Sequence, residues 1–157
     1  SSGVVKVGVG GVFAAGRAVF LAADDARLEQ GVRALFTDLY DLDELPHVEK
    51  DPAAFPQLTS GALADAREQT LRTIVDHLLV RGADYRDLFT TRHTFMTRRL
   101  GPIYDVPVAE DWAPHTFREG GPRAGILTQV SVLALHARTA RSSPVLRGEF
   151  VLDTLLC

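Results

Sequence analysis

The sequence predicts a mostly α protein, an irregular helical bundle with long loops. Three observations lead to this fold class. Apolar residues recur at helical spacing in several segments, capping and stop residues frame those segments, and strand-like alternation is confined to the first ten residues. The composition, 46% hydrophobic and 24% charged, is that of a globular chain. A chain of 157 residues buries roughly two-thirds of its unfolded surface in one core.

The first helix is expected from about Asp25 to Tyr40, after an irregular or strand-like lead over residues 1–20. Asp24 or Asp25 is its predicted N-cap, because a carboxylate accepts from free backbone amides. Its apolar stripe has the spacing i, i+4, i+7, i+8 and i+11 and consists of Leu28, Val32, Leu35, Phe36 and Leu39. The acidic, proline-bearing stretch 41–56 then breaks the helix. It lacks the central glycine of a calcium loop and is interpreted as a solvated linker.

A second helix is predicted from about Ser60 to Val80, with Gly82 as its stop. Its buried face consists of Leu63, Leu71, Ile74 and Leu78. A short helix is expected after Asp84, and another over 94–100, ended by Gly101 and Pro102. The stretch 104–122 is rich in proline, glycine and charge, which predicts a long loop.

The run 123–156 contains two apolar segments joined by a basic, hydroxyl-rich turn. Ser143 followed by Pro144 predicts a helix start, because the serine oxygen accepts from a free amide and proline at the first position loses no needed donor. The second segment places Val145, Leu152 and Leu156 on one side, with Leu155 beside them. The pattern therefore predicts two packed apolar elements around a cationic turn.

The amino-acid sequence of this run resembles the start of the cytochrome-C-type domain of large exported planctomycete-type proteins. The two phrases are RAGILTQ and RSSPVLRGEFVL, and their matching family-motif positions include Arg123, Gly125, Thr128, Ser143, Pro144, Arg147 and Gly148. The preceding segment, with LDELPHVEKDPAAFPQLT and ADYRDLFTTRHTFMTRRLGPIY, resembles the helical domain of unknown function that commonly precedes it. The resemblance covers roughly Leu21 to Leu156 and divides the chain into an unmatched lead 1–20, a helical domain 21–110 and a cytochrome-type part 111–157. Packing of these parts as one unit is the alternative that the sequence leaves open.

The resemblance implies a function in a larger polypeptide. In the family, a C-x-x-C-H haem-attachment motif follows the last apolar helix, whereas this sequence holds one cysteine and no such motif. The expectation is therefore an accessory module of an exported, periplasmic or cell-envelope, c-type cytochrome-like protein that supports electron transfer. The resemblance implies that haem c is to be expected in a downstream region rather than in this chain, and that the expected partners are other domains of the same polypeptide. The alternatives are the substrate cleft of an exported polymer-acting enzyme, and a protein-interaction domain.

The candidate ligands of a haem or metal within the chain are His93, His115 and His136. For each of them the alternative is a histidine that is part of the packing or exposed to solvent. No catalytic residue is assigned and no metal site is predicted, because no histidine or cysteine cluster has ligand spacing. His77, adjacent to Asp76, is expected at a surface position.

Arg147 and Gly148 are unusual residues for their expected positions in a helix. A cation in the first turn of a helix opposes the helix dipole and needs a partner, which is either a carboxylate of this chain or an acidic ligand such as a haem propionate. A glycine inside a helix costs about 1 kcal/mol relative to alanine, which suggests that another backbone or a flat group approaches Gly148 closely.

Two partner classes are disfavoured by the sequence. A net charge of −3 and the absence of a basic patch with interleaved aromatics argue against nucleic acid. No stretch reaches the roughly 20 apolar residues of a membrane span.

Overall fold

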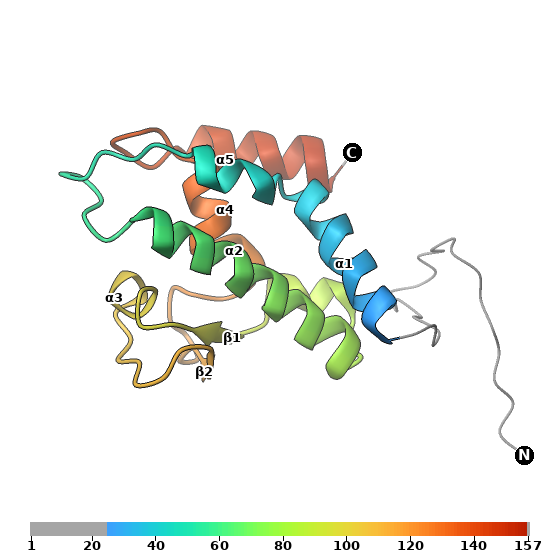
Figure 1. Ribbon diagram of the computed structural model, residues 1–157. Helices are drawn as coiled ribbons and strands as arrows, with labels where there is room; N and C mark the ends of the chain where they lie inside the picture. The colour runs from blue at the N-terminus through green and yellow to red at the C-terminus, as the bar shows by residue number, and fades with distance from the viewer. Residues whose placement is uncertain (1–24, 157) are drawn as a thin grey trace, which may run out of the picture.

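The protein is a mostly α, irregular helical bundle with long loops, as the sequence predicts. The computed structural model describes residues 25–156 (Figure 1). The α-helices and strands are α1 (Asp25–Leu39), α2 (Ser60–Val75), β1 (His93–Met96), α3 (Gly101–Tyr104), β2 (Ala113–Thr116), α4 (Val130–Leu135) and α5 (Pro144–Phe150). Short 3-10 helices span Leu42–His47, Tyr85–Phe89 and Ile126–Thr128, and wider π-type turns extend α2 over Asp76–Val80 and α5 over Val151–Leu155.

Helix α2 forms the centre of the molecule. It runs between α1 and α5 on one side and the small two-stranded sheet on the other (Figure 1). It contacts α1, the 3-10 helix Leu42–His47, α4 and β1. Helix α2 contributes to both apolar clusters of the described residues, through Leu71 and Ile74 to the larger one and through Ala66 to the smaller one.

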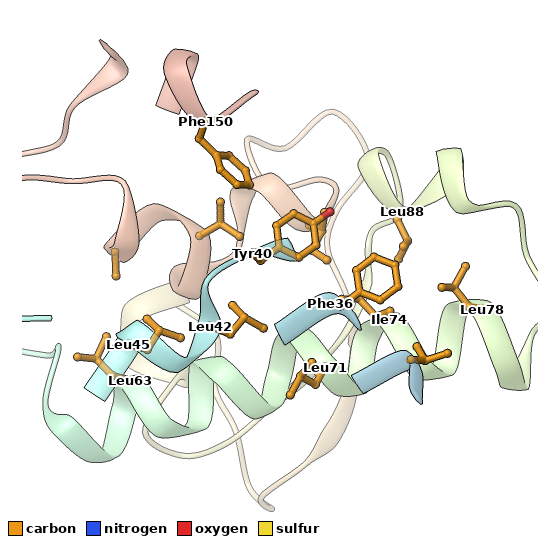
Figure 2. Packing of buried hydrophobic residues seen from close by; sticks show 14 residues of the cluster. Phe36, Tyr40, Leu42, Leu45, Leu63, Leu71, Ile74, Leu78, Leu88 and Phe150 are labelled. Atoms are coloured by element: carbon orange, nitrogen blue, oxygen red, sulfur yellow. The ribbon is translucent and has the colours of Figure 1, made fainter. Parts of the chain in front are cut away.

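The main core lies between α1, α2 and the C-terminal helices (Figure 2). Tyr40, Leu42 and Ile74 are fully buried there. Tyr40 stacks on Phe36 with ring centroids 5.9 Å apart and packs against Phe150 at 5.8 Å. Each such side chain contributes roughly 1.5–3 kcal/mol by leaving water, so this aromatic contact fastens the last helix to the first.

Local signals place most helix boundaries as predicted. The Thr59 hydroxyl accepts from the amide of Ala62 at 3.2 Å at the start of α2, and the Ser143 hydroxyl accepts from the amide of Leu146 at 3.4 Å at the start of α5. Gly82 follows α2 and its extension with φ of 57°, the left-handed conformation of a helix stop. The predicted lead over 1–20 and the proposed cap at Asp24 lie outside the described residues.

The region after α2 differs from the prediction. Residues 94–100 are not a helix, because His93–Met96 form β1, which pairs antiparallel with β2 in the register Thr94 opposite His115. Thr94 and Met96 are buried against α2, and the Gln69 amide donates to the carbonyl of Phe95 at 2.8 Å. These tertiary contacts outweigh the weak local pattern. The predicted loop 104–122 accordingly contains a strand, and Gly101 and Pro102 begin α3 rather than end a helix.

Two apolar stripes are also placed differently. Leu35 is 53% exposed although it belongs to the predicted buried stripe of α1. Val145, Leu152 and Leu156 are 76%, 59% and 71% exposed. The last helix packs through Phe150, Val151 and Leu155 instead, because the Tyr40 ring fixes the rotation of Phe150.

Candidate functional site

A groove of about 510 Å³ lies where the loop before α2 meets α3, α4 and the start of α5. Its apolar lining comes from Phe55 and Leu58 before α2, Ile103 of α3, and Val130, Leu133 and Ala134 of α4. A volume of this size suits a small organic ligand. The groove is therefore the candidate functional site.

Three cations line the same groove: Lys50, Arg123 and Arg147. No aspartate or glutamate is among the described residues that line it. Arg123 and Arg147, both singled out from the sequence, are thus brought together across 24 residues of chain. Lys50 lines the same groove but was not among the residues singled out from the sequence, since it lies in the acidic stretch 41–56 and no local motif marks it.

Arg123 is held in place from two sides. Its Nη1 donates to the carbonyl of Thr128 at 2.8 Å, and its guanidinium carbon lies 5.0 Å from the ring centroid of Tyr104. Planar stacking on an aromatic face stabilises a guanidinium and fixes its orientation. The Thr128 hydroxyl in turn donates to the carbonyls of Ala124 and Gly125, both at 3.0 Å, which closes the turn around Arg123.

Lys50 and Arg147 differ in how they are anchored. Lys50 Nζ donates to the carbonyls of Ala137 at 2.7 Å and Arg138 at 3.2 Å, and burial lowers its pKa from the ordinary value. Arg147 lies in the last turn of α5 rather than the first turn expected from the sequence, and it forms no side-chain hydrogen bond or ion pair with the described residues. Neither of the two has a carboxylate partner in residues 25–156, so the carboxylate from this chain that the sequence suggested for Arg147 is not found there.

The family motif contains two glycines, Gly125 and Gly148, and the fold requires a glycine at position 125. Its φ is +69°, and a Cβ at this position would collide with the carbonyl oxygen of Phe89. The Gly125 amide donates to the carbonyl of Thr91 at 2.7 Å. The close approach lets the chain enter the α4 segment directly beside the Tyr85–Phe89 helix.

Gly148 does not show the close approach expected of it. No described atom outside its own helix lies within 4 Å of the position of a Cβ there, and the residue is exposed. It lies on the outer face of α5, so no backbone or flat group of the described chain explains this glycine. Ser143 and Pro144 have the predicted structural role, the N-cap and the first residue of α5.

A buried polar network joins α2, β1 and the start of α4. We define it by six almost fully buried side chains: Gln69, Thr70, Thr73, Thr94, Gln129 and Ser131. Gln129 is central. Its carbonyl accepts from the Thr70 hydroxyl at 2.7 Å. Its amide donates to the hydroxyls of Thr73 at 3.2 Å and Thr94 at 3.3 Å.

Tyr104 links this network to the wall of the groove. Its hydroxyl donates to the carbonyl oxygen of the Gln69 amide at 2.8 Å and accepts from the amide of Val130 at 2.8 Å. Burial raises the pKa of Tyr104 to about 12, so the hydroxyl remains a donor at neutral pH. The stacking surface for Arg123 is therefore fixed by hydrogen bonds from two directions.

The three candidate histidines lie apart from the groove lining. His93 Nε2 is 3.6 Å from Asp76 Oδ2, while Asp76 pairs with Arg81 at 2.6 Å. Burial, with the charge of Arg81, lowers the pKa of His93 despite the opposing effect of Asp76. His115 on β2 packs edge-on against Phe117, with centroids 5.0 Å apart. Across 25–156, no group of three or more histidine, cysteine, aspartate or glutamate side chains is arranged to hold a metal ion.

His77 is buried rather than at the surface. Its Nε2 lies 2.9 Å from the carbonyl oxygen of Asp84, a contact that ties the end of α2 to the following 3-10 helix. His136 stacks on Phe150 with centroids 4.2 Å apart, and its buried Nε2 has no hydrogen-bond partner among the described residues.

Lowering the pH is expected to destabilise the fold through His136. Burial lowers its pKa from 6.5, against a smaller raising effect of Asp41. The unfolded histidine then binds its proton at higher pH than the folded one. The resulting stability is fully present above about pH 6.5 and is lost as the pH falls below that value towards the folded pKa. Urea unfolding at about pH 7.5 and about pH 5 measures this loss.

The matched variant is His136→Phe, which keeps a ring on Phe150 and removes the titration. It should lose less stability than the parent protein between the two pH values. Equal losses would assign the pH dependence to other groups, of which His93, with its lowered pKa, is the next candidate.

Comparison with known proteins agrees with the resemblance found in the sequence. Within residues 25–156, no helix is long and apolar enough to span a membrane. No curated protein and no solved structure matches the chain. The model of PSCyt3, described as a protein of unknown function (DUF1588), matches residues 123–157. The model of PSD4, also described as a protein of unknown function (DUF1592), matches residues 18–106. Since this second match spans more than half of the chain, the protein belongs to the PSD4 family and carries a PSCyt3-type segment at its C-terminal end.

Proposed function

We propose that this chain is a helical accessory module of an exported multi-domain c-type cytochrome-like protein, where it supports electron transfer without a covalent haem of its own. The observation that supports the proposal is that the buried polar network joins the PSD4 and PSCyt3 segments by hydrogen bonds. Gln129 of the second segment bonds to Thr70, Thr73 and Thr94 of the first. A PSCyt3 segment built into the PSD4 helices in this way would present the adjoining cytochrome-type region in a fixed orientation.

The residues of the chain do not fit covalent attachment of haem c. That attachment needs two thiols and a histidine in one short motif, and the sequence has a single cysteine. The haem would therefore be held by another part of the polypeptide, in the periplasm or the cell envelope. In this arrangement the residues described here position and shield that part rather than exchange electrons themselves.

The test compares the isolated chain with the full-length gene product, each co-expressed with a c-type haem maturation system. The full-length protein should show the absorbance of covalent haem on a denaturing gel and in solution, and the isolated chain should show none. A covalent haem band on the isolated chain would contradict the proposal. So would a full-length protein that carries no haem.

A protein-interaction domain is the second candidate, favoured by the exposed apolar side chains of the last helix, Val145, Leu152 and Leu156. Contiguous exposed apolar surface marks contact sites in monomeric proteins. Replacing Val145 and Leu156 with serine should leave the free energy of unfolding of the isolated chain within about 0.5 kcal/mol, because neither side chain is buried. In the full-length protein the same change should raise the rate of proteolysis next to this helix. An unchanged rate would remove the interaction role of this face.

A further inference from the structure

The groove between the loop before α2, α4 and α5 has positive charge that the described chain does not neutralise. Lys50, Arg123 and Arg147 line it, and no lining residue is acidic. Some arginines elsewhere have carboxylate partners, as Arg33 has with Glu68 at 3.0 Å, whereas the Arg92 side chain bonds only to backbone carbonyls. A single arginine without a carboxylate is therefore not peculiar to the groove; what distinguishes the groove is that three cations line it together with no acidic residue.

The three cations of the groove come from three different segments of the chain and are anchored differently. Arg123 uses one nitrogen for the Thr128 carbonyl and stacks on Tyr104, which leaves the rest of its planar fork of N–H donors. Lys50 is anchored by two backbone carbonyls, which orient an ammonium but do not neutralise it. Arg147 belongs to α5 and has no side-chain hydrogen bond or ion pair with the described residues.

The apolar lining selects the rest of the ligand. Phe55, Leu58, Ile103 and Leu133 offer hydrophobic surface to an occupant of the groove. A phosphate or another small hydrated anion would satisfy the cations and leave this surface in water. An uncharged apolar molecule would cover the surface and leave the cations uncompensated. A ligand with an apolar body and a carboxylate head meets both demands, since guanidinium groups bind carboxylates through two parallel hydrogen bonds.

We propose that this groove is a binding site for a small amphipathic carboxylate, with its apolar body on the lining of α4 and its head group between Lys50, Arg123 and Arg147. The inference concerns the residues of this chain alone and does not depend on the electron-transfer role. Failure of the haem experiment above would leave it intact, and its own failure would leave that role intact.

The test titrates the chain with octanoate by isothermal calorimetry at low ionic strength, with 1-octanol and inorganic phosphate as comparison probes. Octanoate should bind saturably with one site per chain, and at least about tenfold more tightly than either comparison probe, because only octanoate uses both the cations and the apolar lining. In an amide NMR spectrum the binding should shift the signals of Val130, Leu133 and Ala134.

The decisive variant is Arg147→Gln, with Arg141→Gln as its matched control. Both remove one positive charge from the same region, but Arg141 is exposed and does not line the groove. Arg147→Gln should weaken octanoate binding at least about tenfold, while Arg141→Gln changes it less than about twofold. Unchanged far-UV circular dichroism confirms that each variant is folded.

A second variant blocks the apolar part of the site. Ala54 is an exposed residue of the lining, so Ala54→Phe adds a ring to the groove without entering the core. It should abolish octanoate binding. The proposal is overturned if octanoate does not saturate, if octanol or phosphate binds equally well, or if the two arginine variants behave alike.

Discussion

Replacing Gly125 with alanine is expected to lower the free energy of unfolding by more than about 3 kcal/mol. Two separate costs act at this residue. Its φ of +69° is unfavourable for any residue with a Cβ, and the added methyl group would meet the carbonyl oxygen of Phe89. Relief of that collision would move Gly125 away from Thr91, whose carbonyl accepts from its amide at 2.7 Å. Urea unfolding followed by circular dichroism measures the loss.

Gly148→Ala is the control that the same motif offers. No described atom lies within 4 Å of the new methyl group apart from the helix itself, and the residue lies inside α5. Alanine should therefore stabilise the protein by up to about 1 kcal/mol, because it has the higher helix propensity. The opposite signs of the two glycine substitutions distinguish a required conformation from a position at which alanine is tolerated. A stability loss at Gly148 similar to that at Gly125 would contradict this assignment.

Replacing Gln129 with leucine is expected to cost about 2–4 kcal/mol. The substitution keeps a side chain of similar size but removes the hydrogen bonds from Gln129 to Thr70, Thr73 and Thr94. Those hydroxyls are buried, so they cannot turn to water. Each hydroxyl keeps another partner, since Thr70 donates to the carbonyl of Ala66 at 3.1 Å, Thr73 donates to that of Gln69 at 2.8 Å, and Thr94 bonds to Thr73 at 2.9 Å. The expected cost is therefore the loss of three buried hydrogen bonds of about 1 kcal/mol each.

Gln30→Leu is the matched control, because it makes the same chemical change on the exposed surface of α1. Its effect should stay within about 0.5 kcal/mol. If Gln129→Leu were as mild as Gln30→Leu, the buried polar network would not be what joins the α4 segment to α2.

The buried polar network also predicts that unfolding is cooperative across the two matched segments. The segments matched by PSD4 and PSCyt3 should unfold together, because their contact is internal rather than a domain boundary. Fluorescence of Trp112, which lies under Arg72 at 4.4 Å, and far-UV circular dichroism should report one unfolding midpoint. Two separate midpoints would indicate two independently folding domains.

The long helices and their ends are predictable from local sequence. Helix α1, helix α2 and the start of α5 follow from apolar periodicity, the stop at Gly82 and the Ser143–Pro144 cap. These signals are local, since each depends on residues within a few positions of one another. The sequence motif from Arg123 to Gly148 also identified the segment that contains two of the three cations of the groove.

The remaining features depend on contacts between residues that are distant in sequence. The strand β1 exists because Thr94 and Met96 are buried against α2, although the local pattern favoured a helix. The exposed position of Val145 and Leu156 follows from the packing of Phe150 on Tyr40, over one hundred residues away in sequence. The cationic groove requires Lys50, Arg123 and Arg147 to meet in space. Such long-range contacts produce no periodic pattern in the sequence. Local sequence patterns therefore predict the helices but not the groove between them.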